Sequence, residues 1–157
     1  MDDANTKDTH ALPATQRSTE HVILLAGVSA ALGVLALFGM FVKPDPRGFG
    51  THELLGLPPC LPMDRWNVPC PGCGVTTSIA LAAHGQVVRG FLNQPFGALI
   101  ALAVPVVFVW AWALHLRGRD LRVELARWPA GPVGLVIVAL AALAWLYKLA
   151  LVRGWLG

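Results

Sequence analysis

Charged residues are scarce in this chain of 157 residues: they make up 13% of it, whereas hydrophobic residues make up 55%. Soluble domains carry roughly 25% charged residues, and a soluble globule of this size could not bury so much apolar surface. The scarcity therefore excludes an ordinary soluble domain and favours a lipid bilayer as the main partner and solvent. The net charge of +3 comes from scattered residues, so nothing indicates a nucleic-acid surface.

Familiar catalytic patterns are also missing. The sequence has no Ser-His-Asp order, no paired carboxylates, no phosphate loop, no zinc-protease motif, no internal repeat and no low-complexity tract.

The length of the chain fits one domain. Residues 1–20 are polar, and we interpret them as a flexible tail rather than as a secretory signal. Residues 21–157 then form a single membrane domain.

Three long apolar runs are present, at residues 22–42, 95–116 and 132–152. At about 1.5 Å per residue, a helix of this length crosses a hydrocarbon core of about 30 Å. The sequence therefore predicts an all-α integral membrane protein with three transmembrane helices. Pro95 suits the first turn of the second helix, where its missing N–H costs nothing, and Pro105 predicts a kink in it.

Small residues mark the first span, and one lysine marks the third. Gly27, Gly33 and Gly39 lie at six-residue steps, a pattern that lets a neighbouring helix approach closely. Glycine is also simply common in membrane helices, which leaves an ordinary explanation open. Lys148 falls in the last turn of the third span, and we expect its amine to reach the lipid headgroups.

The loop between the second and third spans carries four arginines within residues 117–127. By the positive-inside rule this loop is cytoplasmic. Three spans then place the N-terminus inside and the loop of residues 43–93 outside. Lys43 and Arg47, at the outer end of the first span, argue in the opposite direction.

Residues 43–93 are rich in proline and glycine, which predict a loop with two short helical pieces. Thr51 can cap one helical turn that stops at Gly56. Residues 76–84 read as a short helix that Thr76 or Thr77 caps and Gly85 ends. At about 13 Å this helix cannot span a bilayer, so we expect an interfacial or re-entrant helix whose N-terminus faces the cysteines.

Cysteine is rare, and all three copies fall in this loop: Cys60, Cys70 and Cys73. In the run Cys-Pro-Gly-Cys-Gly, Pro71 and Gly74 help the backbone turn so that two sulfurs face one point. Such clustering in a turn-rich segment is not typical of a buried hydrophobic cysteine, and we expect the three thiols to converge on one small site.

Three interpretations of the cysteines stay open. The first is a zinc or iron knuckle, with His52 or His84 as a fourth ligand, although each histidine alone also fits ordinary packing. The second is a structural disulfide from Cys60 to one of the other two. The third is redox exchange, for which Cys70 should be exposed and have a low pKa.

The stretch from Gly50 to Cys60, followed by Pro69 to Ser78, resembles the family of small bacterial membrane proteins known as domain of unknown function 2752. The resemblance rests on an upstream cysteine, the CPxCG motif with its following threonine, His84-Gly85, and Asn93-Gln94-Pro95. Thr77 stands where many relatives have arginine. The resemblance implies a multi-pass protein of the bacterial inner membrane, and it implies no established activity.

These observations favour a non-enzymatic accessory or scaffold subunit of a membrane complex, whose cysteine loop is fixed by a metal or a disulfide and whose partners are other membrane-protein subunits. The alternative is a membrane thiol-disulfide oxidoreductase that uses Cys70 and Cys73, with Cys60 passing electrons onward.

Overall fold

The computed structural model describes residues 18–155. The predicted tail of residues 1–20 therefore lies almost wholly outside the described residues. Its last two positions are already helical, because α1 begins at Thr19 with Ser18 as its N-cap, and the Ser18 side chain accepts a hydrogen bond from the backbone N–H of His21.

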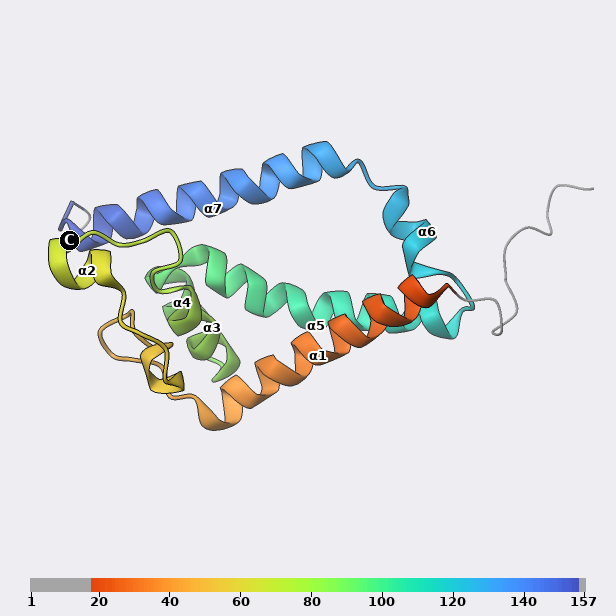
Figure 1. Cartoon of the computed structure of the whole chain (residues 1–157), viewed down its shortest axis with the longest axis horizontal. Coiled ribbons are helices and arrows are strands. Elements are labelled where there is room, and N and C mark those ends of the chain that lie inside the picture. Colours follow the sequence, from red (N-terminus) through yellow and green to blue (C-terminus); the bar gives the residue numbers. More distant parts are fainter. Residues whose placement is uncertain (1–17, 156–157) are drawn as a thin grey trace, which may run out of the picture.

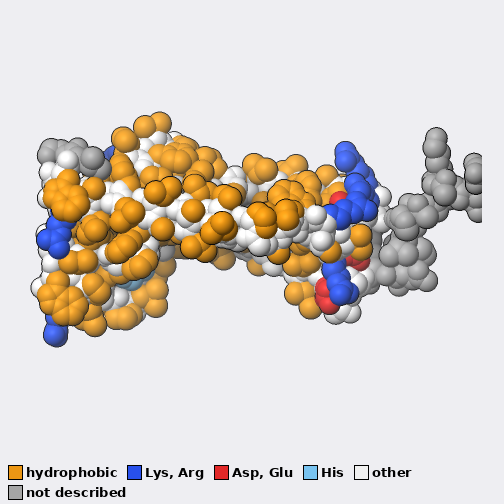
Figure 2. All heavy atoms as spheres, turned by 90° about the horizontal axis from the view of Figure 1, so that it is seen from above, with side chains coloured by type: hydrophobic (Ala, Val, Ile, Leu, Met, Phe, Trp, Pro, Cys, Tyr) orange, Lys and Arg blue, Asp and Glu red, His pale blue; other side chains and the backbone are white. Residues whose placement is uncertain are grey.

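Three helices are long and apolar enough to cross a membrane: α1 (Thr19–Phe41), α5 (Pro95–Leu116) and α7 (Ala130–Val152). They confirm the predicted all-α architecture with three candidate spans. Pro95 occupies the first turn of α5, as expected, and α5 continues through Pro105 as one helix. Figure 2 shows hydrophobic side chains along the middle of the molecule and arginine or lysine side chains at both ends, the pattern expected of a bilayer-spanning bundle.

Short helices fill the connections. The described part of the loop between α1 and α5 contains the 3₁₀ turn η2 (Glu53–Leu55), α2 (Leu61–Trp66), α3 (Val75–Ala83) and α4 (Val87–Asn93). A further short helix, α6 (Leu121–Ala126), lies between α5 and α7. The sequence predicted one short helix in this loop besides the helical turn, whereas the structure has three. Helices of one or two turns are hard to recognise in a sequence rich in proline and glycine.

Threonines do not cap the predicted pieces, which is a correction. The N-cap of α3 is Gly74, whose φ of 84° is readily adopted only by glycine, and Thr77 lies within the helix. The N-cap of η2 is His52, not Thr51. Both threonines are fully buried, and their Oγ1 atoms are 2.8 Å apart, so they join the loop to α3 instead.

The predicted stops are confirmed. Gly56 ends η2 with a φ of 80°, and Gly85 follows α3 with a φ of 76°. Positive φ is costly for residues with a Cβ, so glycine at both places lets the chain leave each helix without strain.

Helix α3 lies at the centre of the loop end, packed against α1, α4 and α5 (Figure 1). Each neighbour approaches it through a glycine. A Cβ at Gly39 of α1 would be 2.9 Å from the carbonyl oxygen of Ala83, and one at Gly97 of α5 would be 2.6 Å from that of Val75. Such contacts explain how a short apolar helix is held among three others.

The glycine pattern of α1 is only partly used for close packing. Gly39 contacts α3, but a Cβ at Gly27 or Gly33 would meet nothing within 4 Å. The predicted close approach of a neighbouring helix is thus seen at one of the three positions.

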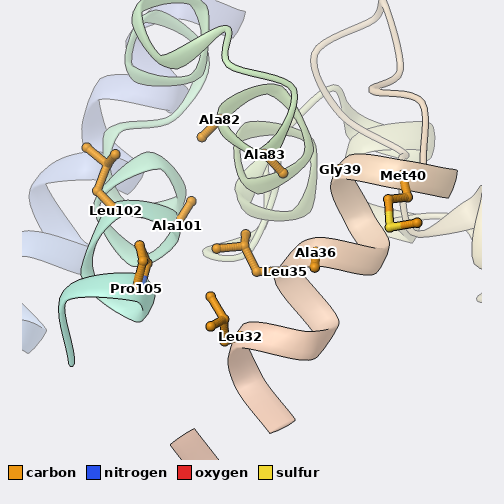
Figure 3. Close-up of a pocket in the computed structure, with 10 residues that line it drawn as sticks. All are labelled: Leu32, Leu35, Ala36, Gly39, Met40, Ala82, Ala83, Ala101, Leu102 and Pro105. Atoms are coloured by element: carbon orange, nitrogen blue, oxygen red, sulfur yellow. The ribbon is translucent and has the colours of Figure 1, made fainter. Parts of the chain in front are cut away.

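An apolar pocket of about 470 Å³ lies between α1, α3 and α5 (Figure 3). Side chains from all three helices line it, among them Leu35, Met40, Ala83 and Leu102. Gly39, where α1 comes close to α3, forms part of the pocket wall.

At the end far from the cysteine loop, polar side chains join α1, α5 and α6. His21 is fully buried, and its Nε2 lies 3.0 Å from Nδ1 of His115 in a stacked pair. Its Nδ1 accepts a hydrogen bond from the backbone N–H of Leu121. Asp120 caps α6 and accepts hydrogen bonds from Ser18. We call these four residues, Ser18, His21, His115 and Asp120, the histidine network.

Helix α7 stands apart from α1 along the bundle (Figure 1). Its only buried residues are Ala144 and Lys148, both in its last three turns. These turns lie beside the cysteine loop, so α7 is attached to the rest of the described chain mainly at that end.

Candidate metal centre

Two separate segments bring the cysteines into place. Cys60 is the N-cap of α2, and Pro62 sits in the first turn of that helix, where it starts a helix without losing a hydrogen bond. Asn67 ends α2 in the left-handed conformation, with a φ of 51°, and turns the chain back. The chain therefore returns to Cys60 within ten residues.

The second segment is a tight turn. The backbone N–H of Cys73 donates to the carbonyl of Cys70 at 2.9 Å, and Gly74 then leads into α3. Pro71 lies exposed on the outside of this turn. The turn places both sulfurs on its inner side, toward Cys60.

The three sulfurs lie within 4.8 Å of one another. Cys73 is buried, with 4% of its surface exposed, and Cys60 and Cys70 are partly buried. Around a tetrahedral zinc ion, with bonds of about 2.3 Å, neighbouring sulfurs are about 3.8 Å apart. The thiols thus converge as predicted, at a separation that a metal ion could bridge after a small adjustment.

The three thiols differ electrostatically. Burial and the neighbouring thiols raise the pKa of Cys73 to about 12. Burial and a hydrogen bond with Cys60 also raise the pKa of Cys70. Burial acts to raise the pKa of Cys60 too, but hydrogen bonds from the N–H of Met63 and from Cys70 outweigh it, and this pKa is lowered.

The low-pKa thiol is therefore Cys60 and not Cys70. Cys70 lacks the low pKa that the redox interpretation requires of it, and only part of its surface is exposed. A cation placed among the three sulfurs would favour the thiolate form of each one.

A buried lysine lies next to the cysteines. Lys148, with 5% of its surface exposed, donates from Nζ to the carbonyl of Gly48 at 3.1 Å and to Oδ1 of Asn93 at 2.8 Å. Its positive charge acts to lower the pKa of Cys73. The expectation that Lys148 reaches the headgroups is wrong: its amine turns inward, because the loop offers two acceptors and a group of thiols.

Asn93 connects the lysine to the turn. While its Oδ1 accepts from Lys148, its Nδ2 donates to the carbonyl of Gly74 and to Oγ of Ser78. Sequence analysis noted Asn93 only as part of the step into the second span and missed this role. A polar residue two positions before a membrane helix, in the loop that holds the cysteines, was the available signal.

Two more side chains of α7 bind the loop. Nε1 of Trp145 donates to the carbonyl of Pro69 at 2.9 Å, and the hydroxyl of Tyr147 donates to that of Leu92 at 2.8 Å. Pro69 directly precedes Cys70, so α7 contacts the cysteine turn itself. Sequence analysis assigned no role to either aromatic residue.

The two candidate histidines are not brought to the cysteines. The cluster of metal-binding side chains found in the described residues contains the three cysteines alone. Nδ1 of His84 lies 2.8 Å from the carbonyl oxygen of Ala80, within its own helix. His52 begins η2. Thr76 is partly buried in the first turn of α3.

The sequence model of the family described as "Protein of unknown function (DUF2752)" matches residues 60–116. The match covers all three cysteines, α3, α4 and α5, and confirms the resemblance that the CPxCG motif suggested. No curated protein and no solved structure matches the chain.

Proposed function

We propose that this protein is a small, non-enzymatic scaffold subunit of a bacterial inner-membrane complex, and that Cys60, Cys70 and Cys73 bind one zinc or iron ion that fixes its outer loop. The observation that carries the proposal is the convergence of three sulfurs, from two chain segments, within 4.8 Å. A loop of this length, rich in proline and glycine, gains a fixed shape when a metal closes it.

The charge of Lys148 favours a metal over a disulfide. Three thiolates around a divalent cation carry a net charge of −1, which a buried ammonium offsets. A neutral disulfide would leave that ammonium, with 5% of its surface exposed, without an opposite charge.

The scaffold role rests on what the fold offers to partners. Hydrophobic side chains along α7 are exposed, among them Leu135, Val138 and Leu143. In the bilayer they would contact lipid or helices of other subunits. The arginine-rich segment around α6 would lie in the cytoplasm, and the metal-bound loop outside.

Metal analysis tests the metal site. Protein purified in detergent under reducing conditions should contain one zinc or iron per chain, and the Cys60→Ser/Cys70→Ser/Cys73→Ser variant should contain none. In protein purified without a reductant, a mass lower by two hydrogens, with no metal, would instead establish a disulfide. Photocrosslinking from Val138 in membranes should capture a second membrane protein; crosslinks to lipid alone would contradict the scaffold role.

One observation favours the redox alternative, namely the lowered pKa of a partly exposed thiol, Cys60. In that case Cys60, rather than Cys70, would be the attacking thiol. Reversible two-electron cycling of the purified protein between dithiol and disulfide, with a quinone as oxidant, would establish this function in place of the scaffold.

A further inference from the structure

Three cysteines leave one position of a tetrahedral metal site to be filled. Structural zinc sites are almost always four-coordinate, with cysteine, histidine or carboxylate ligands. The cluster contains the three cysteines alone, so a fourth protein ligand would have to reach the ion by turning its side chain toward the sulfurs.

A polar pocket of about 290 Å³ borders the cysteine cluster. Cys60 forms part of its wall, and so do three charged side chains: Arg47, Glu53 and Asp64. A further ligand could reach an ion bound to Cys60 from this pocket, since Cys60 lines it.

Asp64 lies in the first turn of α2, the helix that has Cys60 as its N-cap. The two residues are four positions apart, and the backbone N–H of Asp64 donates to the carbonyl of Cys60 at 3.0 Å. Both side chains line the pocket.

The other carboxylates nearby are already engaged. Glu53 and Asp45 each pair with the Arg47 guanidinium, at 2.8 and 2.7 Å. Within residues 18–155, the exposed Asp64 carboxylate has no ion pair and no side-chain hydrogen bond. It can therefore rotate toward the sulfurs without breaking another interaction.

We propose that Asp64 supplies the fourth ligand, so that the site is Cys60, Asp64, Cys70 and Cys73 around one divalent cation. This inference rests on the proposed metal-binding function and names the ligand that completes it. The carboxylate oxygen closes the side of the ion that faces the pocket. The buried Lys148 ammonium, which influences Cys73, offsets part of the negative charge of the ligand set.

The test is cobalt(II) added to reduced, metal-free protein in detergent, because cobalt reports coordination through its visible spectrum. Asp64→Asn should weaken cobalt binding by at least about tenfold, since even groups that only support a metal ligand contribute 10–100-fold, and should change the d–d bands. Asp64→Cys should bind more tightly and show stronger thiolate-to-cobalt charge transfer. Glu53→Gln, which alters a carboxylate of the same pocket, should match the wild type.

The possible results distinguish the claim that the three cysteines bind a metal from the claim that Asp64 is its fourth ligand. If the wild type binds cobalt and Asp64→Asn shows the same affinity and spectrum, Asp64 is not a ligand, while the three-cysteine site stands. If wild-type protein binds no cobalt, the proposed metal function fails and this inference fails with it. Unchanged thermal unfolding of metal-free Asp64→Asn would show that the variant folds.

Discussion

The two ends of the helix bundle are held together by different kinds of contact. At the cysteine end, side chains of α7 donate mostly to backbone carbonyls of a loop, around three thiols and one buried ammonium. At the other end, the histidine network joins α1, α5 and α6 through side chains that bond to one another and accept from the backbone N–H groups of Ser18 and Leu121. One end can depend on a bound ion, whereas the other needs only its own residues.

The ends should also be energetically independent. The helix that connects them, α5, has 22 residues and is about 33 Å long at 1.5 Å per residue. Substitutions separated by more than about 10 Å usually have additive effects. Each substitution below should therefore affect its own end.

The largest effect should come from Cys73→Ser. This is the most buried of the three thiols, and its loss removes a ligand from the proposed metal site. We expect loss of bound metal and a destabilisation of about 4 kcal/mol or more, measured as thermal unfolding in detergent. A chelator should lower the unfolding temperature of the wild type but not that of Cys73→Ser. Equal sensitivity to the chelator would contradict a metal at this site.

Next in size should be Lys148→Met, which leaves Oδ1 of Asn93 and the carbonyl of Gly48 without a donor. Hydrogen bonds from a charged group contribute up to about 3 kcal/mol, and metal affinity should fall as well. Lys43→Met is the matched control, since this lysine is exposed at the end of α1. A Lys148 variant as stable as the control would mean that α7 does not depend on this contact.

A third comparison uses two glycines. Gly97→Ala places a Cβ 2.6 Å from the carbonyl oxygen of Val75, and the crowding should cost about 2 kcal/mol. Gly27→Ala meets nothing within 4 Å and should be neutral or slightly stabilising. The measurement is the thermal unfolding temperature of each variant. If Gly97→Ala and Gly27→Ala unfold at the same temperature, α3 and α5 are not in close contact.

A smaller effect is expected from His21→Phe at the histidine network. Phenylalanine leaves the backbone N–H of Leu121 without its acceptor, at a cost of about 1–2 kcal/mol. Metal content should stay at the wild-type level, because the cysteine end is remote. Combining His21→Phe with Lys148→Met should give the sum of the two effects, and a marked departure from additivity would show that the ends are coupled.

The smallest effect concerns pH. Burial acts to raise the pKa of Asp120, but hydrogen bonds from the backbone N–H of Arg122 and from Ser18 outweigh it, so this pKa is lowered on folding. Its stabilising contribution is thus complete above the unfolded pKa of about 3.9 and is lost as the pH falls through the lower folded value. Between pH 5 and pH 3, the unfolding temperature of Asp120→Asn should decline less steeply than that of the wild type. If the unfolding temperatures of the two proteins decline in parallel, the Asp120 carboxylate does not contribute to this pH dependence.

The spans and the cysteine cluster could be predicted because their signals are local. A run of about 20 apolar residues specifies a membrane helix without knowledge of its neighbours. In the same way, a Cys-Pro-Gly-Cys turn forces Cys70 close to Cys73. The positive φ of Gly56 and Gly85 follows from the same kind of local rule.

Contacts between distant segments could not be predicted. Lys148 lies 100 positions from Gly48, and no local pattern indicates whether its amine turns toward headgroups or toward a loop. The pairing of Thr51 with Thr77 was missed for the same reason: each threonine also fits a helix cap, and only the packing of the loop on α3 decides between the two roles.

The way α7 binds the loop has a consequence for natural sequence variation. Its side chains donate to main-chain oxygens of Gly48, Pro69 and Leu92, which every amino acid provides. Replacing the side chain of Leu92 should leave the acceptor in place, whereas inserting or deleting one residue nearby would move it. Among relatives, the residue at the position of Leu92 should therefore vary, while the number of residues around it should stay constant.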